Sequence, residues 1–127
     1  MRNHLGKDKF KIKQIVSMKI KLKNSIIEAD VADDFWKRMV GLSFSEKKNM
    51  FFPLPYEDRW SLWMFAVKYP LKMIFIYKNK VVIDIKEGKP ITSDPKTWKT
   101  YKPKKPCKYI LETPFDLKVG IGDKLSW

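Results

Sequence analysis

Near its start the chain alternates apolar residues with lysine in two short stretches, KFKIKQIV at residues 9–16 and MKIKLK at residues 18–23. A period of two places the apolar side chains on one face of an extended strand and the ammonium groups on the other. The pattern therefore predicts two strands, followed by another at residues 25–31, SIIEADV. Residues 1–9 hold almost nothing that a core would bury, so they are predicted to form a mobile basic arm, to which the first strand segment could also belong.

One short amphipathic helix is predicted near residues 34–41. Asp33 or Asp34 supplies a carboxylate that can cap its first turn, and Gly41 is the residue type that commonly ends a helix. Between them, apolar residues recur at spacings of three and four: Phe35, Trp36, Met39 and Val40. We expect this to be the only substantial helix.

The clearest strand pair is a hairpin. Apolar runs at residues 73–77 and 81–85 are bridged by Lys-Asn-Lys, and Asn79 tolerates the positive φ that a tight turn requires. A strand is also predicted at residues 60–65. Because Trp60 and Trp63 are an odd number of positions apart, they should face opposite sides of that strand, one toward the core and one toward the surface.

Toward the C-terminus, residues 86–106 are polar and contain four prolines, which predicts a long surface loop. Residues 109–113 resume as a strand, and a turn at residues 119–123 leads into a short final strand. Many short strands with one helix indicate a mostly-β fold. We expect a single compact domain over residues 10–127, either a β-sandwich or a partly open, jelly-roll-like barrel.

The chain is strongly basic, with 27 Lys and Arg against 14 Asp and Glu and a formal net charge of +13. Residues 1–23 carry eight basic groups and one acid, so the other 104 residues hold nearly half of the excess. Such a field attracts polyanions, and the attraction weakens as salt rises. The alternative is that abundant lysine reflects a thermophilic proteome and serves solubility.

A basic segment with two aromatic rings lies at residues 96–108. Bases can stack on such rings while ammonium groups follow phosphates, which is how single strands are held without sequence readout. The alternative is that the rings pin the loop to the body. If the segment binds nucleic acid or another polyanion, it should form one continuous basic surface with the lysines of residues 7–23. The candidate binding residues are Lys96, Trp98, Lys99, Tyr101, Lys102, Lys104, Lys105 and Lys108.

Groups for catalysis or metal binding are scarce. His4 is the only histidine and Cys107 the only cysteine, so the chain offers neither a nucleophile paired with a histidine nor a soft-metal ligand set. We expect no metal, no cofactor and an inert thiol. Most carboxylates, Asp84 included, are expected to be solvated surface charge, with Glu112 in the 109–113 strand as the exception.

The chain has no run of about 18 apolar residues, so no membrane-spanning helix is expected. The lysines of its first stretch interrupt any apolar segment that a secretory signal would need. A lone cysteine requires no oxidising compartment. These features predict a cytoplasmic protein.

Several motifs occur in an order that resembles one family. They include Val31-Ala32-Asp33, Gly41-Leu42, the block Ser61-Leu62-Trp63-Met64, Pro70-Leu71, Ile110-Leu111-Glu112 and Gly122-Asp123. On these the chain resembles the family called domain of unknown function 192, whose fold is a compact, mostly-β, jelly-roll-like domain and whose function is not known. The residues that match the family's landmarks include Arg38, Gly41, Trp63, Met64, Pro70 and Glu112.

This chain departs from the family pattern at three polar positions. Relatives carry an Asn-Thr pair where this chain has Ala66-Val67, and an Asp where it has Lys72. If relatives use that cluster for catalysis or ligand binding, this chain cannot run the same chemistry. If the cluster is a structural hydrogen-bond network, replacing its members together costs little stability, because an apolar substitute leaves no buried donor unpaired. Arg38 and Glu112 both match the family and could form a structural ion pair.

The sequence does not establish a function; it favours a non-enzymatic binding or accessory module with a strongly basic surface, for which nucleic acid or another polyanion is one candidate ligand. The competing interpretation is an enzyme or small-ligand binder, for example for carbohydrate, with a hollow near Trp63 and converging carboxylates. That suggestion rests on analogy with the fold.

Overall fold

The computed structural model describes residues 16–32, 47–64 and 67–127 of the chain. These residues form eight strands and one short 3-10 helix, so the mostly-β prediction is confirmed. The mobile arm predicted at residues 1–9, the strand predicted at residues 9–16 except for its last residue, and the helix predicted at residues 34–41 lie outside the described residues. The elements are β1 (Val16–Lys21), β2 (Ile26–Val31), β3 (Met50–Asp58), β4 (Leu62–Trp63), β5 (Leu71–Ile76), β6 (Val82–Gly88), η1 (Pro95–Thr97), β7 (Thr100–Tyr101) and β8 (Cys107–Thr113).

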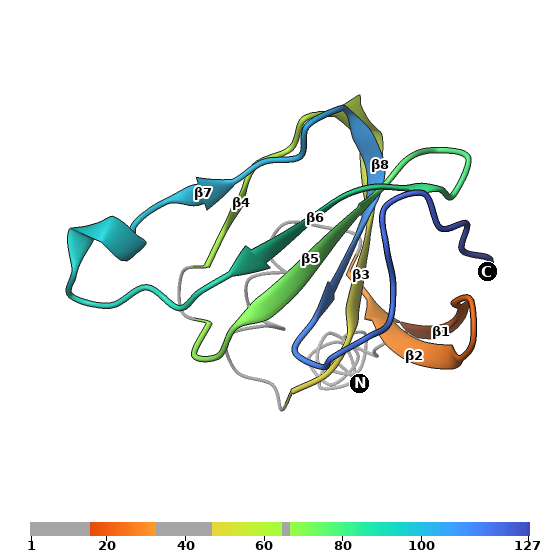
Figure 1. The fold of residues 1–127 in the computed structure, drawn as a ribbon, viewed down its shortest axis with the longest axis horizontal. Coiled ribbons are helices and arrows are strands. Elements are labelled where there is room, and N and C mark those ends of the chain that lie inside the picture. Colours follow the sequence, from red (N-terminus) through yellow and green to blue (C-terminus); the bar gives the residue numbers. More distant parts are fainter. Residues whose placement is uncertain (1–15, 33–46, 65–66) are drawn as a thin grey trace, which may run out of the picture.

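Six of the strands form one mixed sheet in the order β1-β2-β3-β8-β5-β6, and β4 pairs with β7 in a separate two-stranded sheet (Figure 1). Only β2 and β3 run parallel to each other; the other neighbours in the sheet are antiparallel. Within the described ranges, no helix has the length and apolar character needed to cross a membrane.

The first and last strands of this sheet are joined through the C-terminal segment. The Lys21 amide donates to the Ser126 carbonyl at 2.8 Å, and the Leu125 amide donates to the Lys80 carbonyl at 2.9 Å. The segment thus links β1 to the turn before β6, although these elements are at opposite ends of the strand order. Leu125 is fully buried and packs in a cluster with Ile20 of β1.

Strand β5 has a core on both of its faces. Leu71, Met73 and Phe75 belong to one buried cluster, whereas Ile74 and Ile76 belong to the other. Because side chains alternate along a strand, a strand covered on both faces reads as a continuous apolar run. This explains why the segment is apolar without a period of two.

The predicted hairpin is confirmed, with β5 and β6 paired from Leu71 opposite Gly88 to Ile76 opposite Val82. Its turn differs from the expectation, because Lys80 and not Asn79 has the positive φ, 71°. The Asn79 side-chain oxygen instead accepts a hydrogen bond from the Val81 amide at 3.1 Å. Asn79 therefore stabilises the turn through its side chain, which is a second property that favours Asn in turns.

Candidate functional site: a projecting basic arm

Between β6 and β8 the chain leaves the body and forms an arm, which we define as residues 89–106. Figure 1 shows the arm extending to the left, with β7 along it and η1 at its tip. Where the arm begins, a Cβ on Gly88 would lie 2.6 Å from Met73 Cε and 2.8 Å from Met64 Sδ. Glycine lets the backbone pass this close to the core before it projects outward.

The tip of the arm is braced by its own hydrogen bonds. The Asp94 carboxylate caps η1 by accepting from the Lys96 amide at 3.0 Å, and Pro95 occupies the first turn. The Thr97 hydroxyl accepts from the Thr92 amide at 2.8 Å and donates to the Asp94 carbonyl at 2.8 Å. A capped turn that is closed by a threonine holds its shape without a core.

Trp98 follows this turn and is held by it. Its indole Nε1 donates to the Thr92 carbonyl at 2.7 Å, while 58% of the residue remains exposed. The polar edge of the ring is therefore satisfied within the tip, and much of the residue faces solvent. The ring does not pin the loop to the core.

The pairing of β4 with β7 connects the arm to a distant part of the chain. Leu62 is opposite Tyr101 and both are buried, whereas Trp63 is opposite Thr100 and both are exposed. The two-stranded sheet therefore has an inward and an outward face. The strand predicted at residues 60–65 is reduced to Leu62–Trp63, so Trp60 lies outside it; Trp60 is partly buried against the core, whereas Trp63 is exposed.

Tyr101 anchors the arm. Its side chain packs in the core, and its hydroxyl accepts a hydrogen bond from the Lys89 amide at 3.1 Å. The Lys99 ammonium lies 5.4 Å from the centroid of its ring. Of the two rings singled out in the 96–108 segment, the structure buries Tyr101 and exposes Trp98.

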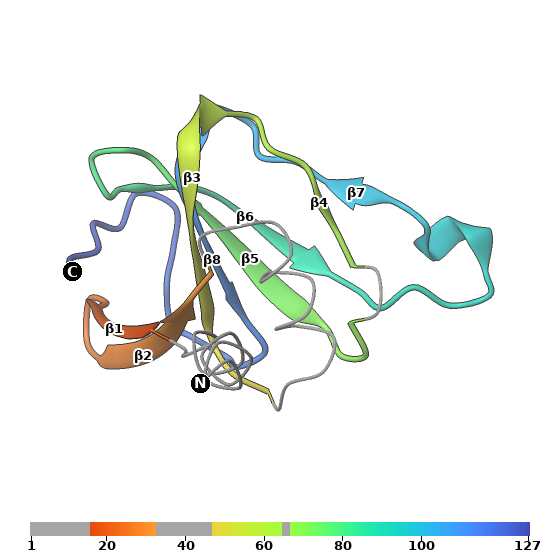
Figure 2. The ribbon, with the colours of Figure 1, turned by 180° about the vertical axis from the view of Figure 1, so that it is seen from behind.

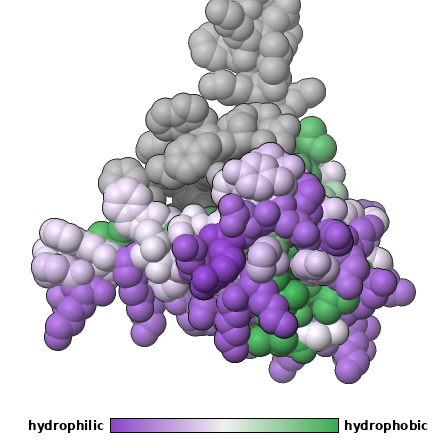
Figure 3. All heavy atoms as spheres, turned by 90° about the horizontal axis from the view of Figure 1, so that it is seen from above, coloured by the Kyte–Doolittle hydropathy of each residue, from purple (hydrophilic) through white to green (hydrophobic). Residues whose placement is uncertain are grey.

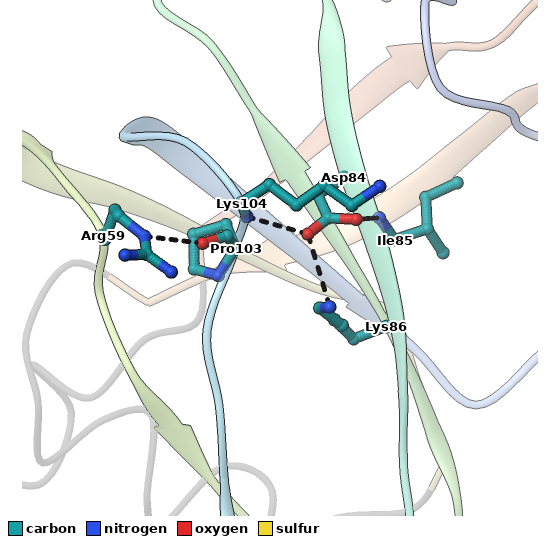
Figure 4. Close-up of polar contacts among 6 residues, drawn as sticks. All are labelled: Arg59, Asp84, Ile85, Lys86, Pro103 and Lys104. Atoms are coloured by element: carbon teal, nitrogen blue, oxygen red, sulfur yellow. Dashed lines mark hydrogen bonds and ion pairs between the residues drawn. The ribbon is translucent and has the colours of Figure 1, made fainter.

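The returning strand of the arm is tied to the body by two polar contacts (Figure 4). The Arg59 Nε donates to the Pro103 carbonyl at 2.9 Å, and the Lys104 amide donates to Asp84 Oδ2 at 2.9 Å. Asp84 also accepts from the Ile85 amide, and its Oδ2 lies 3.7 Å from the Lys86 ammonium. These groups hold residues 103–104 between β3 and β6.

The expectation that Asp84 is solvated surface charge is wrong, because only 2% of the residue is exposed. A buried carboxylate is tolerated where hydrogen-bond donors and a cation surround it, as here. The local sequence carries no signal for this, since Lys104 lies 20 positions away.

The lysines of the arm are exposed, and none has a carboxylate partner among the described residues. Lys108, just beyond the arm, is half-buried and donates to the Leu54 carbonyl, so it contributes to the body. In the part of the chain that the structure describes, none of the lysines at residues 96–108 forms a salt bridge. Figure 3 shows strongly hydrophilic side chains extending from the arm, at the left of the view. The exposed lysines of the arm are Lys89, Lys96, Lys99, Lys102, Lys104 and Lys105.

The second basic surface lies elsewhere. Lys19, Lys21 and Lys23 are exposed along and just after β1, and Figures 1 and 2 both place β1 and β7 at opposite ends of the molecule. The expected continuous basic surface is therefore not formed by the described lysines. The reason is topological, because the C-terminal segment links β1 to the turn before β6, whereas the arm leaves from the other end of β6, after Gly88.

The residues that match the family's landmarks occupy different environments. Met64 is buried beside Gly88, Pro70 is exposed just before β5, and Glu112 is buried in β8 between Met50 and Met73 of the neighbouring strands. Arg38 and Gly41 lie outside the described residues. The expected ion pair between Arg38 and Glu112 stays a prediction.

Sequence reasoning missed Tyr69, which lies near the buried carboxylate. Burial raises the pKa of its hydroxyl, and the negative charge of Glu112 raises it further. The Lys47 ammonium lies 5.5 Å from the centroid of the Tyr69 ring. Trp63 is exposed, and residues 65–66 beside it lie outside the described residues, so the ligand-binding hollow expected there also stays a prediction.

Two departures from the family pattern are accommodated by packing. Val67 is buried in the core, where its apolar side chain needs no hydrogen bond. Lys72 is half-buried; its ammonium donates to the Leu117 carbonyl at 3.1 Å and lies 3.8 Å from Asp116 Oδ1. Both positions therefore serve the fold in this chain.

Cys107 begins β8 and is fully buried. Burial is the main cause that raises the pKa of its thiol to about 12, and the negative charges of Glu57 and Asp58 also raise it. A hydrogen bond with the Trp60 backbone acts in the opposite direction and lowers the pKa. Since the thiolate is the reactive form, burial and the raised pKa favour the inert thiol expected from the sequence, which stays a prediction. Among the described residues, no three His, Cys, Asp or Glu side chains are grouped so as to hold a metal ion.

The fold and the arm define a small, mostly-β protein with a basic projection. The chain belongs to the domain of unknown function 192 family: the family model, described as an uncharacterized ACR, matches residues 16–127. This confirms the resemblance found in the motifs.

The chain is similar to proteins of archaea that bear only a family designation. It is 37% identical to a UPF0127 protein of Pyrococcus furiosus over 80% of this chain and 87% of that protein. It is 35% identical to a UPF0127 protein of Thermococcus sibiricus over 76% of this chain, but it spans only 64% of that relative's length. The relatives come from thermophilic archaea, which supports a thermophilic origin for the chain.

Two crystal structures share the fold. One is a candidate transcription regulator from Sinorhizobium meliloti, with a TM-score of 0.75 and 20% identity over 89% of this chain and 95% of that one. The other, a protein of unknown function from Novosphingobium aromaticivorans, has a TM-score of 0.69 and 22% identity over 90% of this chain and 86% of that one. At these identities the likeness concerns the fold alone.

Proposed function

We propose that this protein is a non-enzymatic, cytoplasmic module that binds polyanions through the basic arm. The observation that carries the proposal is the group of six exposed lysines in the arm that have no carboxylate partner among the described residues. Each ammonium group that neutralises a phosphate releases counterions, and this release supplies affinity without sequence readout.

The shape of the arm supports the same function. The tip is closed by hydrogen bonds around Thr97, and the base is tied by Asp84 and Arg59. The lysines are therefore carried on a braced projection, and less backbone entropy is lost when an extended ligand binds.

The competing explanation is that the lysines reflect thermophilic composition. In thermophilic proteins, added lysine is typically organised with acidic residues into surface ion-pair networks. A salt bridge of that kind occurs between Lys48 and Asp30, at 2.7 Å. The lysines of the arm form none with the described residues, so composition alone accounts for them less well than ligand binding does.

The test compares two triple variants with equal charge loss. Lys96, Lys102 and Lys105 are changed to Gln in one protein, and Lys19, Lys21 and Lys23 are changed to Gln in the control. Binding of labelled oligonucleotide and of polyphosphate is measured by anisotropy across a series of salt concentrations.

Loss of three phosphate contacts should lower the salt slope by about 2 and the oligonucleotide affinity by roughly 100-fold at about 0.1 M salt. The control should retain affinity within about threefold, because its lysines lie at the other end of the molecule. Equal losses in both variants would contradict a localised site. Absence of binding by the unmodified protein at low salt would contradict polyanion binding altogether.

A further inference from the structure

We infer that the outer edge of β1 binds an acidic, extended peptide segment of a partner protein as an additional strand. This surface is separate from the basic arm, because Figures 1 and 2 place β1 and β7 at opposite ends of the molecule. The inference therefore concerns a second interaction and does not depend on polyanion binding. It rests on main-chain groups of β1 that pair with no described residue, and the lysines of β1 indicate the charge of the partner.

Two hydrogen bonds at the end of β1 show which main-chain groups face outward. The Leu22 amide donates to the Ser25 carbonyl at 2.7 Å, within the turn that leads to β2. The Lys21 amide instead donates to the Ser126 carbonyl at 2.8 Å, on the side of β1 away from β2. Successive residues of a strand direct their main-chain groups to opposite sides, so every second residue before Lys21 also faces outward.

Two further positions of β1 therefore carry open main-chain groups. The register between β1 and β2 is unbroken from Val16 to Lys21, so the groups of Lys19 and Ser17 face away from β2. Among the residues that the structure describes, only Lys21 of these three has a main-chain partner on that side. The edge thus presents two amide donors and two carbonyl acceptors to an added strand.

The other edge of the sheet is occupied by groups of the protein itself. The Val82 amide of β6 donates to the Asp123 carbonyl at 2.9 Å, and the Ile85 amide donates to the side chain of Asp84. Asp84 also accepts from the Lys104 amide of the arm. Proteins usually cover a sheet edge in such ways, because an open edge pairs with other chains. The open segment of β1 therefore suits strand addition, in which main-chain hydrogen bonds supply the affinity.

The solvated face of β1 defines the charge of the partner. Residues directly opposite each other share a face, so partner side chains across from Lys19 and Ser17 lie on this solvated face. Lys19 and Lys21 are exposed there and form no salt bridge with the described residues. Glu28 lies across from Lys19 on the inner strand β2, whereas lysine is the only charged residue type of β1. Carboxylates of the partner are therefore favoured at these positions, and ammonium groups are disfavoured.

The other face of the added strand lies over the core. Ile20 is fully buried in a cluster with Leu125, and Met18 and Trp127 pack against that cluster. A partner side chain across from Met18 is directed to this face, where an apolar group extends the cluster. The partner is thus a segment in which acidic and apolar residues alternate.

A second copy of this chain is a poor occupant of the edge. Two β1 strands side by side would bring Lys19 and Lys21 of one copy close to the same residues of the other, and like charges directly opposite are destabilising. Residues 1–15 are unsuited by their composition, because they carry five basic residues and one acid. Lysines on this edge therefore disfavour self-pairing and favour pairing with an acidic strand.

The experiment uses the full chain and three labelled peptides of equal length. The first alternates Glu and Val, the second is the same peptide with N-methyl groups on its Glu residues, and the third alternates Lys and Val. N-methylation of the Glu residues removes the donors that would face Lys19 and Ser17 while it retains the side chains.

Two triple variants localise the binding. In one protein the lysines of the β1 edge are changed to Gln, and in the matched control three lysines of the arm are changed to Gln. Affinity is measured by anisotropy, and urea denaturation verifies that both variants are folded. The changes are Lys19→Gln, Lys21→Gln and Lys23→Gln in the first variant, and Lys96→Gln, Lys102→Gln and Lys105→Gln in the control.

We expect the Glu-Val peptide to bind roughly 10-fold or more tightly than either of the other peptides, because only it combines free donors with carboxylates. The β1 variant should lower its affinity by about 10-fold. The arm variant should retain the affinity within about twofold, since the arm lies at the other end of the molecule.

Amide hydrogen exchange gives a second readout at single residues. In the free protein the amides of Met18 and Ile20, which face β2, should exchange slowly, whereas those of Ser17 and Lys19 should exchange fast. The Glu-Val peptide should slow the exchange of Ser17 and Lys19.

The outcomes that would overturn the inference differ from one another. Equal binding of the N-methylated peptide, or no slowing of exchange at Ser17 and Lys19, would exclude strand addition. Equal binding of the Lys-Val peptide, or an equal loss of affinity in the two triple variants, would exclude an acidic partner at β1. Slow exchange of Ser17 and Lys19 in the free protein would show that the edge is already occupied.

Discussion

The two lysine-rich regions of this protein, β1 and the arm, are alike in composition but are stabilised by different contacts. In β1, Lys19 and Lys21 alternate with Met18 and Ile20, and the strand is held because Ile20 is fully buried. In the arm, the lysines follow no alternation, and the segment is held by a capped turn, by the buried ring of Tyr101 and by the carboxylate of Asp84.

The two sets of lysines also differ in whether the fold explains their presence. On β1 they form the solvated face of an amphipathic strand, and Lys19 is opposite Glu28 of β2. The fold explains them without a ligand. On the arm, exposed lysines accompany an exposed tryptophan and form no salt bridge with the described residues, so the fold does not require them.

The largest effect on stability is expected in β1. Replacing Ile20 by Ala should lower the free energy of unfolding by about 3 to 4 kcal/mol, because a fully buried side chain would leave a cavity in the cluster around Leu125. Urea denaturation measures this loss. The folded variant should still bind oligonucleotide with unchanged affinity, and a large drop in that affinity would show that the two basic regions act together.

A smaller loss of stability, but a larger effect on binding, is expected at the base of the arm. Asp84→Ala should lower the free energy of unfolding by about 2 to 3 kcal/mol, since the amides of Ile85 and Lys104 lose their acceptor. Because the arm loses this tether, oligonucleotide affinity should fall as well.

Asp84→Asn retains the shape of the side chain and one acceptor oxygen. It should therefore lower the free energy of unfolding, measured by urea denaturation, and the oligonucleotide affinity, measured by anisotropy, less than Asp84→Ala does. If Asp84→Ala left both quantities unchanged, the tether would have no role in holding the arm.

At neutral pH the smallest effect is expected where the arm returns to the sheet, because this effect develops only at alkaline pH. The folded state raises the pKa of the Cys107 thiol from 9.0 to about 12, so between these values the folded protein keeps a proton that the unfolded chain loses. The unfolded state then binds fewer protons, and stability falls as pH rises above about 9.

The Cys107→Ala variant should lack this contribution, and so the stability of the unmodified protein should fall more steeply over that range in urea titrations. Iodoacetamide should also react slowly with the folded protein at about pH 8 and readily in urea. Fast alkylation of the folded protein would contradict the burial of the thiol.

The elements that sequence analysis predicted well are those with a strong local pattern. The hairpin of β5 and β6, the strand β8 and the alternating strand β1 were all identified from apolar runs or a period of two. Such patterns reflect the faces of a single element, which the local sequence carries.

The candidate site was predicted only in part. Residues 86–106 were expected to be a loop, yet they include β7, which has two residues and pairs with a two-residue strand nearly 40 positions earlier. A strand of two residues has no period to detect. The basic character of the arm was visible in the sequence, but the partnership of Trp63 with Thr100 was not.

Local sequence is sufficient for the mostly-β class, the hairpin and the net positive charge, because each depends on residue type and spacing alone. Tertiary structure decided which lysines lie apart from carboxylates, which of the arm's rings is exposed, and that Asp84 is buried. These outcomes depend on contacts between residues far apart in the chain, such as Asp84 with Lys104 and Trp63 with Thr100, whose geometry exists only once the strands have paired.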